Sequence, residues 1–136
     1  MTYAVSAALQ EWVFATLTAD ATLAGLVGGQ IFDAAPVGDA PTLCVLLGDE
    51  TVRDRSDQSG QGAWHDFRIG VITDDAGFTR AKQAAAAVCD ALIGQDAVLS
   101  RGRIVCVHFR FARTRRMETG RIRQIELTFR ARVTDD

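Results

Sequence analysis

The sequence predicts an α+β fold: one mixed or antiparallel β-sheet with two helices packed on one of its faces. Two observations indicate this class. Long runs alternate apolar and polar residues, as half-buried strands do, and two segments repeat apolar residues at helical spacing. The expected order is α-β-β-β-α-β-β. The chain of 136 residues fits one domain, residues 1–136, which is large enough to fold without a disulfide or a metal.

The central strands are expected within residues 42–73. Leu43–Leu47 are all apolar, which is typical of a strand buried on both faces. From residue 64 onward apolar and polar side chains alternate, so one face of the second strand should be buried. That face holds His65, Phe67, Ile69 and Val71.

A polar loop that contains two glycines is expected between these strands, over residues 53–62. A two-residue turn is enough to join antiparallel strands, and longer loops in small domains are commonly functional. We therefore interpret the loop as a contact surface for a protein partner. Its candidate partner-binding residues are Arg53, Asp54, Arg55, Asp57 and Gln58.

Two amphipathic helices are expected, over residues 4–18 and 78–93. The second carries a stripe of small residues, mostly alanine, which allows a helix to lie close to a sheet. Gly94 should end it. Asp20 is suited to cap a short helical segment over residues 21–27.

Two long strands are expected near the C-terminus, over residues 104–111 and 122–133, with a basic turn at 113–120 between them. Shorter strands are expected at 30–34 and 98–99. Both long strands alternate, so each should bury one face. The apolar faces are Val105, Val107, Phe109 and Phe111 in the first strand and Ile125, Leu127, Phe129, Ala131 and Val133 in the second.

The net charge of −2 conceals a strong asymmetry along the chain. Residues 1–100 carry five basic and thirteen acidic side chains, a balance of −8. Residues 101–132 carry ten arginines against Glu118 and Glu126, a balance of +8. A subunit whose two parts have opposite charge attracts copies of itself or a neighbour of opposite sign.

The arginine-rich C-terminal hairpin has two interpretations: it binds nucleic acid, or it binds an acidic protein surface. Sheets that bind nucleic acid usually expose aromatic side chains on which bases stack. Here Phe109, Phe111 and Phe129 share the apolar alternation and are expected in the core, which favours a protein partner. The candidate partner-binding residues are Arg113, Arg115, Arg116, Arg121 and Arg123.

No residue pattern indicates catalysis or a cofactor. Cys106 and His108 share a strand face, and His65 is a conceivable third ligand, but zinc sites usually show tighter paired spacings. The glycines after Ser59 precede a strand, whereas a phosphate loop precedes a helix. Asp74 precedes a predicted helix, where capping explains it better than acid–base chemistry. We expect no enzyme, metal site or cofactor, and a small enzyme remains the least favoured alternative.

The sequence shows neither a signal peptide nor a membrane-spanning run. The N-terminus lacks the basic start and apolar block of a signal peptide, and no apolar run approaches the roughly 20 residues of a transmembrane helix. Cys44, Cys89 and Cys106 are an odd number of cysteines in apolar contexts, which favours buried free thiols. We expect a protein made in, or assembled from, a cytosol, without membrane contact.

Several stretches together resemble the tail-completion, or tail-terminator, family of long-tailed (siphovirus-like) phages and gene transfer agents. They are, in chain order, the N-terminal amphipathic helix, DATLAGLVGGQIFDAAP, LLGDETVRDRSDQSGQGAWHDFRIGVIT, GFTRAKQAAAAVCDAL, and RGRIVCVHFRFARTRR leading into RIRQIELTFRARV. The resemblance is one of layout over nearly the whole chain, and no single motif in it has the specificity of a metal or nucleotide signature.

The resemblance implies a structural virion protein at the neck of a phage-like particle, assembled in the host cytoplasm. Members of this family form a ring, typically a hexamer, that ends the tail tube at its head-proximal end. The implied partners are further copies of the chain, the tail tube protein and the head–tail connector or stopper protein, with DNA only as passing cargo. The alternatives are a nucleic-acid-binding module that uses the arginine-rich hairpin, or another head–tail joining protein.

The resemblance transfers no individual site residue, so the interface candidates come from charge and layout. For the arginine turn, the acidic partners nearest by layout are Asp49, Glu50, Asp54 and Asp57 of a neighbouring copy. This head-to-tail pairing is the contact that a ring of identical subunits requires.

Overall fold

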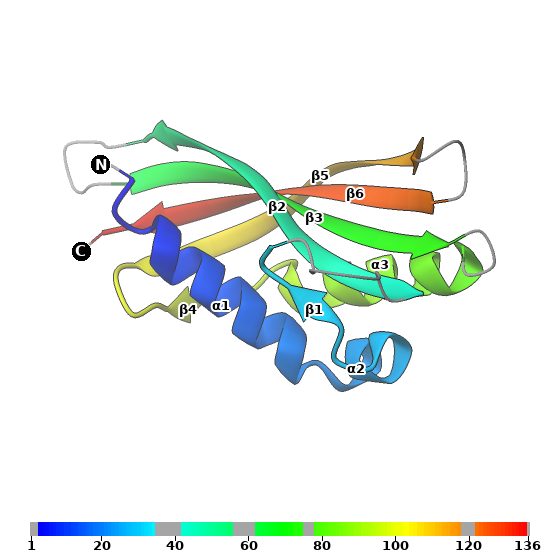
Figure 1. Ribbon diagram of the computed structural model, residues 1–136. Helices are drawn as coiled ribbons and strands as arrows, with labels where there is room; N and C mark the ends of the chain where they lie inside the picture. Colours follow the sequence, from blue (N-terminus) through cyan, green and yellow to red (C-terminus); the bar gives the residue numbers. More distant parts are fainter. Residues whose placement is uncertain (1–2, 35–41, 56–61, 75–77, 118–121, 136) are drawn as a thin grey trace.

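A computed structural model describes residues 3–34, 42–55, 62–74, 78–117 and 122–135. Within them, three helices lie on one side of a curled six-stranded sheet (Figure 1). The elements are α1 (Ser6–Ala19), α2 (Ala21–Val27), β1 (Ile31–Phe32), β2 (Leu43–Asp54), β3 (Gly62–Asp74), α3 (Phe78–Leu92), β4 (Ala97–Val98), β5 (Arg103–Met117) and β6 (Ile122–Thr134). The predicted α+β class is confirmed.

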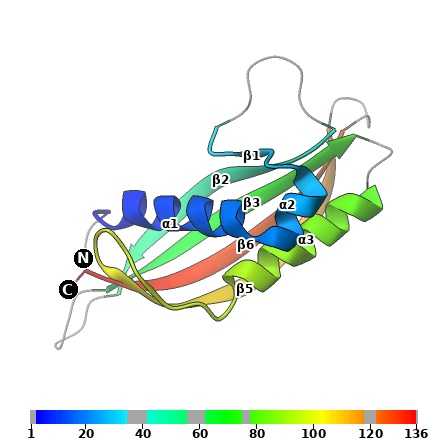
Figure 2. The same cartoon turned by 90° about the horizontal axis from the view of Figure 1, so that it is seen from below.

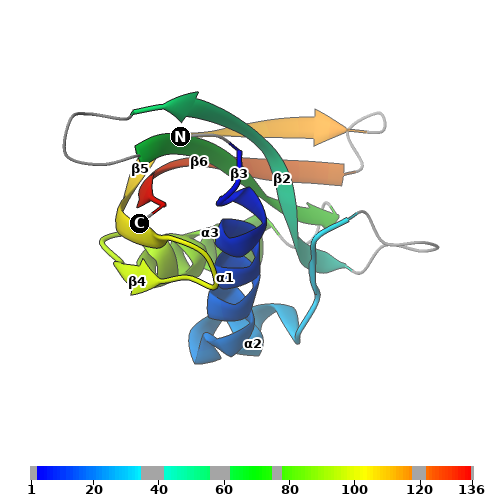
Figure 3. The same ribbon diagram turned by 90° about the vertical axis from the view of Figure 1, so that its left-hand side faces the viewer.

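The described strands form a mixed sheet, one of the two predicted alternatives, with the strand order β1-β2-β3-β6-β5-β4. Only β1 and β2 run parallel, and every other neighbouring pair is antiparallel. The central pair, β3 and β6, is aligned without a register shift from Gly62↔Thr134 to Asp74↔Ile122. β2 and β5 flank this pair, and the curl of the sheet is visible in Figure 3.

Helices α1 and α3 pack on the same face of the sheet, as predicted, and α2 packs beside them (Figure 2). The expectation of two helices is corrected to three, because the short segment after Asp20 is a helix of its own. The carboxylate of Asp20 accepts a hydrogen bond from the backbone N–H of Leu23 at 2.9 Å, which caps α2. Gly28 ends α2 in the left-handed conformation that glycine adopts without steric cost.

The core lies between the helices and the facing side of β3 and β6. The predicted alternation of β6 is confirmed, since Ile125, Leu127, Phe129, Ala131 and Val133 are all buried. The rings of Phe67 and Phe129 stack across the two strands with centroids 5.5 Å apart. The small-residue stripe of α3 also faces this core, which allows the helix to approach the sheet closely.

The predicted core face of β5 is wrong in part. Val107 is buried, but Val105, Phe109 and Phe111 are exposed, the two phenylalanines by 44% and 50%. Register shifts between Ile104 and Cys106, and between Phe109 and Phe111, mark bulges that each add one unpaired residue to β5. Beyond the second bulge the alternation reverses, so Phe111 lies on the helix-free side with Thr128. Phe109 pairs with Phe129 on the predicted helix-covered side, but it lies on the open outer strand β5 and stays partly exposed.

Both predicted loops are shorter than expected. β2 continues through Arg53 and Asp54, which pair with Trp64 and Ala63 of β3, so these candidates lie on a strand. β5 likewise runs to residue 117, so the expected basic turn is mostly strand. Arg113, Arg115 and Arg116 lie on β5, whereas Asp57, Gln58 and Arg121 fall outside the described residues.

Candidate interaction surfaces

The sheet face turned away from the helices, here called the helix-free face, is rich in arginine. Strand alternation and cross-strand pairing place on it Asp66 of β3 and Glu126 and Arg130 of β6. Every second residue of these strands lies on the same face, with the residues that pair with them. Among the paired residues of the described strands, its arginines are Arg53, Arg68, Arg103, Arg113, Arg115, Arg130 and Arg132, and its carboxylates are Asp66, Asp74 and Glu126. About half of the arginines of residues 101–132 therefore lie on this face, and β2 and β3 add Arg53 and Arg68 to it.

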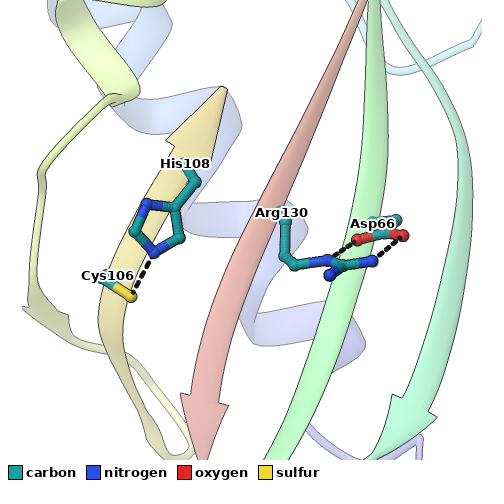
Figure 4. Close-up of polar contacts among 4 residues, drawn as sticks. All are labelled: Asp66, Cys106, His108 and Arg130. Carbon is teal, nitrogen blue, oxygen red and sulfur yellow. Dashed lines mark hydrogen bonds and ion pairs between the residues drawn. The ribbon is translucent and has the colours of Figure 1, made fainter. Parts of the chain in front are cut away.

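An ion pair at the centre of this face joins Asp66 and Arg130 (Figure 4). Arg130 donates from Nε to Oδ1 at 2.7 Å and from Nη2 to Oδ2 at 3.1 Å, the paired geometry that a guanidinium and a carboxylate favour. These hydrogen bonds lower the pKa of Asp66, and the positive charges of Arg110 and Arg53 act in the same direction. The guanidinium of Arg130 also lies 5.3 Å from the ring centre of Trp64.

The candidate arginines of β5 divide between the two faces. Arg113 and Arg115 lie on the helix-free face, with Nε of Arg113 3.4 Å from Glu126 and Nη2 of Arg115 3.9 Å from it. Arg116 pairs with Arg123 on the other face, where the guanidinium of Arg123 lies 4.6 Å from the ring centre of Phe78. The cluster predicted from the sequence is therefore two groups of side chains.

The structure also separates the two sets of predicted partner-binding residues. Arg53, Asp54 and Arg55 lie where β2 meets β3, at the end of the strands that holds the pair Gly62↔Thr134. The described candidates of the C-terminal hairpin lie toward the opposite end, near the pair Met117↔Ile122; they are Arg113, Arg115, Arg116 and Arg123. A single copy therefore does not bring the two sets into one site.

The long strands β2 and β5 each have an outer edge that is mostly unpaired in the described part of the chain. β1 pairs with β2 only at Val45 and Leu46, and β4 pairs with β5 only at Arg103 and Ile104. Within the described part of the chain, no strand pairs with the rest of either outer edge. Beside the open part of β2 and against α1 lies a pocket of about 570 Å³. Its lining includes Tyr3, Leu9, Val13, Leu47, Phe67 and Ile69, with Asp49 and Glu50 beside them.

Comparison with known families identifies the family of this chain. Residues 11–134 match the model of the family described as Tail completion protein gp17. The chain belongs to this family. It is therefore a structural protein of a phage-like tail, as the resemblance in the sequence predicted. The family description does not assign individual residues, so the surfaces above remain candidates.

A solved structure extends the comparison. A chain in the virion of a native gene transfer agent (GTA) particle is 56% identical to this one and superposes with a TM-score of 0.91. The alignment covers 98% of this chain and 99% of that chain. The comparison with curated proteins gives no match. Among the described helices, none has both the length and the apolar character that crossing a membrane requires.

The metal ligands considered from the sequence lie on two different faces of this tail completion protein. Sγ of Cys106 and Nε2 of His108 are 3.2 Å apart on β5, on the helix-free face (Figure 4). His65 pairs with buried Ala131 and points to the opposite, helix-covered side. Over the described ranges, no three His, Cys, Asp or Glu side chains are grouped closely enough to hold a metal ion.

A buried polar cluster escaped prediction from the sequence. His65 is fully buried, with Nδ1 3.5 Å from Oε2 of Glu50, and the hydroxyl groups of Tyr3 and Ser6 donate to Oε1 of the same carboxylate. The one sequence feature that points to this cluster is the position of His65 on the apolar face of the alternating strand β3. Its partners come from β2 and the start of α1, which only the folded chain brings together.

Proposed function

We propose that this protein forms a ring of six copies that ends the tail tube at its head-proximal end and joins the tail to the head connector. DNA passes through the opening of the ring. The observation that carries the proposal is the family match over residues 11–134, together with the 56% identity to a chain of a gene transfer agent virion. On this basis we place the chain at the neck of a virion-like particle.

The shape of the subunit supports a role in assembly. Its helix-free face is rich in arginine, and β2 and β5 have long unpaired edges at opposite sides of the sheet. Open edges that differ from each other suit a head-to-tail contact, which closes into a ring when the rotation between copies allows it. We propose Arg53, Asp54 and Arg55 at one end of the strands, and Arg113, Arg115, Arg116 and Arg123 toward the other, as contacts to neighbouring copies, tube or connector.

Particles that lack this chain test the proposal directly. We expect tail tubes of irregular length that do not join filled heads, because nothing stops tube growth or offers the connector a surface. Adding the purified chain to isolated tubes should place a cap of ring-like mass at one end of each tube, seen by electron microscopy and by mass measurement. Tails of normal length, joined to heads in the absence of the chain, would contradict the proposal.

A second candidate function is nucleic-acid binding through the arginine-rich hairpin. The exposure of Phe109 and Phe111 favours it, because these rings, expected in the core, are partly open to solvent next to arginine side chains. Binding of DNA fragments that weakens steeply as salt rises would support this function. Binding that is absent at low salt would leave the ring as the only candidate.

A further inference from the structure

We infer that the open edge of β5 in one copy docks on the open edge of β2 and the α1–β2 pocket of a second copy. This inference rests on the proposed ring and identifies the surfaces that close it. Three independent features of the subunit point to it: the direction of the two edges, an exposed aromatic ring that matches a pocket, and opposite charges beside them.

The two edges have the correct direction for pairing. The path from β2 to β5 crosses β3 and β6 through three antiparallel steps, so β2 and β5 run in opposite directions. A second copy that continues the sheet in the same orientation therefore presents its β5 antiparallel to β2 of the first. Unpaired edge strands readily take up a strand from another chain. The contact is heterologous, and its repetition generates a ring when the rotation between copies closes.

The exposed ring of Phe109 matches the pocket in position and chemistry. Phe109 pairs with Phe129 on the helix-covered side of the sheet and touches its ring edge-on, with centroids 6.0 Å apart. The pocket lies on the same side at the β2 edge, beside α1. One row of paired residues crosses the four long strands, in the order Glu50, Phe67, Phe129 and Phe109. If a second copy continues the sheet without a shift along the strands, Phe109 of one copy lies at the pocket beside Glu50 of the other.

The charges beside these features are opposite. Asp49 is exposed at the rim of the pocket, within the irregular part of β2 between Leu47 and Glu50. Arg110 is exposed at the β5 bulge, next to Phe109. Placing the ring of Phe109 in the neighbouring pocket brings Arg110 toward Asp49. Complementary charges at such a contact favour the correct register over others.

Variants in this contact provide the first test. Phe109→Ala and Asp49→Arg should each reduce the number of tube ends capped by the full-length chain by roughly tenfold or more at equal protein concentration. Phe14→Ala is the matched control, since Phe14 is a similarly exposed phenylalanine on α1 outside the pocket. The double variant Asp49→Arg with Arg110→Asp should restore capping, because it exchanges the two charges. Asp49 is exposed, so its variant tests the contact even if Phe109→Ala folds poorly.

A single cysteine tests the register. Arg53, Trp64, Arg132 and Cys106 form one row across the sheet, so the inferred contact places Arg53 of one copy opposite the native Cys106 of the next. Arg53→Cys should then form a disulfide between copies on tube ends, seen as a ladder of multimers without reductant. Within one copy the two positions are three strand spacings apart, about 14 Å, which exceeds the reach of a disulfide. Adding Cys106→Ser should abolish the ladder.

The outcomes separate this inference from the proposed function. If the parent chain caps tubes and both single variants cap them equally well, or Arg53→Cys gives no ladder, the edge contact is overturned while the ring proposal stands. If the parent chain itself does not cap tubes, the proposed function fails and the edge contact fails with it. Loss of capping in both single variants, its restoration by the charge exchange, and the ladder together support the contact.

Discussion

The imidazole of His65 on β3 lies 3.5 Å, from Nδ1 to Oε2, from the carboxylate of Glu50 on β2, inside the subunit. Burial lowers the pKa of His65, and the nearby negative charge of Glu50 opposes this effect without reversing it. Burial alone would raise the pKa of Glu50, but the hydrogen bonds that Ser6 and Tyr3 donate, together with the nearby imidazole of His65, lower it below its ordinary value. The pair therefore resists protonation at both groups.

We expect the free energy of unfolding to decrease as pH falls below about 6.5, the ordinary pKa of histidine. Because the folded pKa of His65 is lowered, the unfolded chain binds this proton first, and acid favours unfolding. The lowered pKa of Glu50 has the same sign at more acidic pH, where its contribution is lost as pH falls through the folded pKa. Urea unfolding at about pH 7.5 and about pH 5.5 measures the first effect.

The chain has two histidines, which gives this prediction a matched control. His65→Gln should remove most of the difference in unfolding free energy between the two pH values, whereas His108→Gln, on the exposed side of β5, should retain it. The interpretation is wrong if both variants keep the pH dependence of the parent.

Two phenylalanines that look equivalent in the sequence should respond differently to truncation. Phe129→Ala should lower the free energy of unfolding by about 3–5 kcal/mol, since it empties a buried site between Phe67 and Phe109. Phe111→Ala should change it by only about 0.5 kcal/mol, because half of that ring is already exposed. Urea denaturation of both variants at neutral pH measures the two changes in the free energy of unfolding. Equal decreases would show that Phe111 is packed as tightly as Phe129.

The same two residues show what the sequence can predict about the fold. The alternation of β3 and β6 was read correctly because these strands pair without a register shift, so a period of two holds along their length. In β5 the bulges at two positions break that period, and a bulge has no distinct signature in a run such as Val105–Phe111. Capping was predictable, because the hydrogen bond from Asp20 is local.

The candidate surfaces were predictable only by charge. The count of arginines located the basic hairpin, but not its division between two faces, which depends on the strand continuing to residue 117. The contribution of Arg68 and Arg53 to the same face depends on the pairing of β2 and β3 with β6, which no local pattern encodes. The cluster of Glu50 and His65 likewise requires contacts between distant segments.

The central ion pair of the helix-free face should contribute measurably to stability. Asp66→Asn and Arg130→Met should each cost about 1.5–3 kcal/mol, because the two side chains are partly buried and joined by two charge-assisted hydrogen bonds. The double variant should cost less than the sum of the two, by an interaction energy of about 0.5–3 kcal/mol. A double-mutant cycle by urea denaturation measures this energy, and strict additivity would show that the pair contributes nothing of its own.

Removing charge from Arg113 and Arg115 separates their role in assembly from their role in folding. Both contact Glu126, but their side chains are 61% and 48% exposed, and exposed ion pairs contribute little. The double variant to glutamine should therefore change the free energy of unfolding by less than about 1 kcal/mol. Reversal to glutamate is a poorer test, since it would place new carboxylates against Glu126.

We expect this glutamine double variant to lose capture on tube ends or on the connector, because two positive charges disappear from a surface proposed to meet an acidic partner. Glu126→Gln is the control: it removes the shared internal partner and leaves both arginines in place, so capture should persist. Electron microscopy of tube ends and the yield of DNA-filled particles are the measurements. Normal assembly combined with loss of packaged DNA would show instead that Arg113 and Arg115 face the passing DNA and not a neighbouring protein.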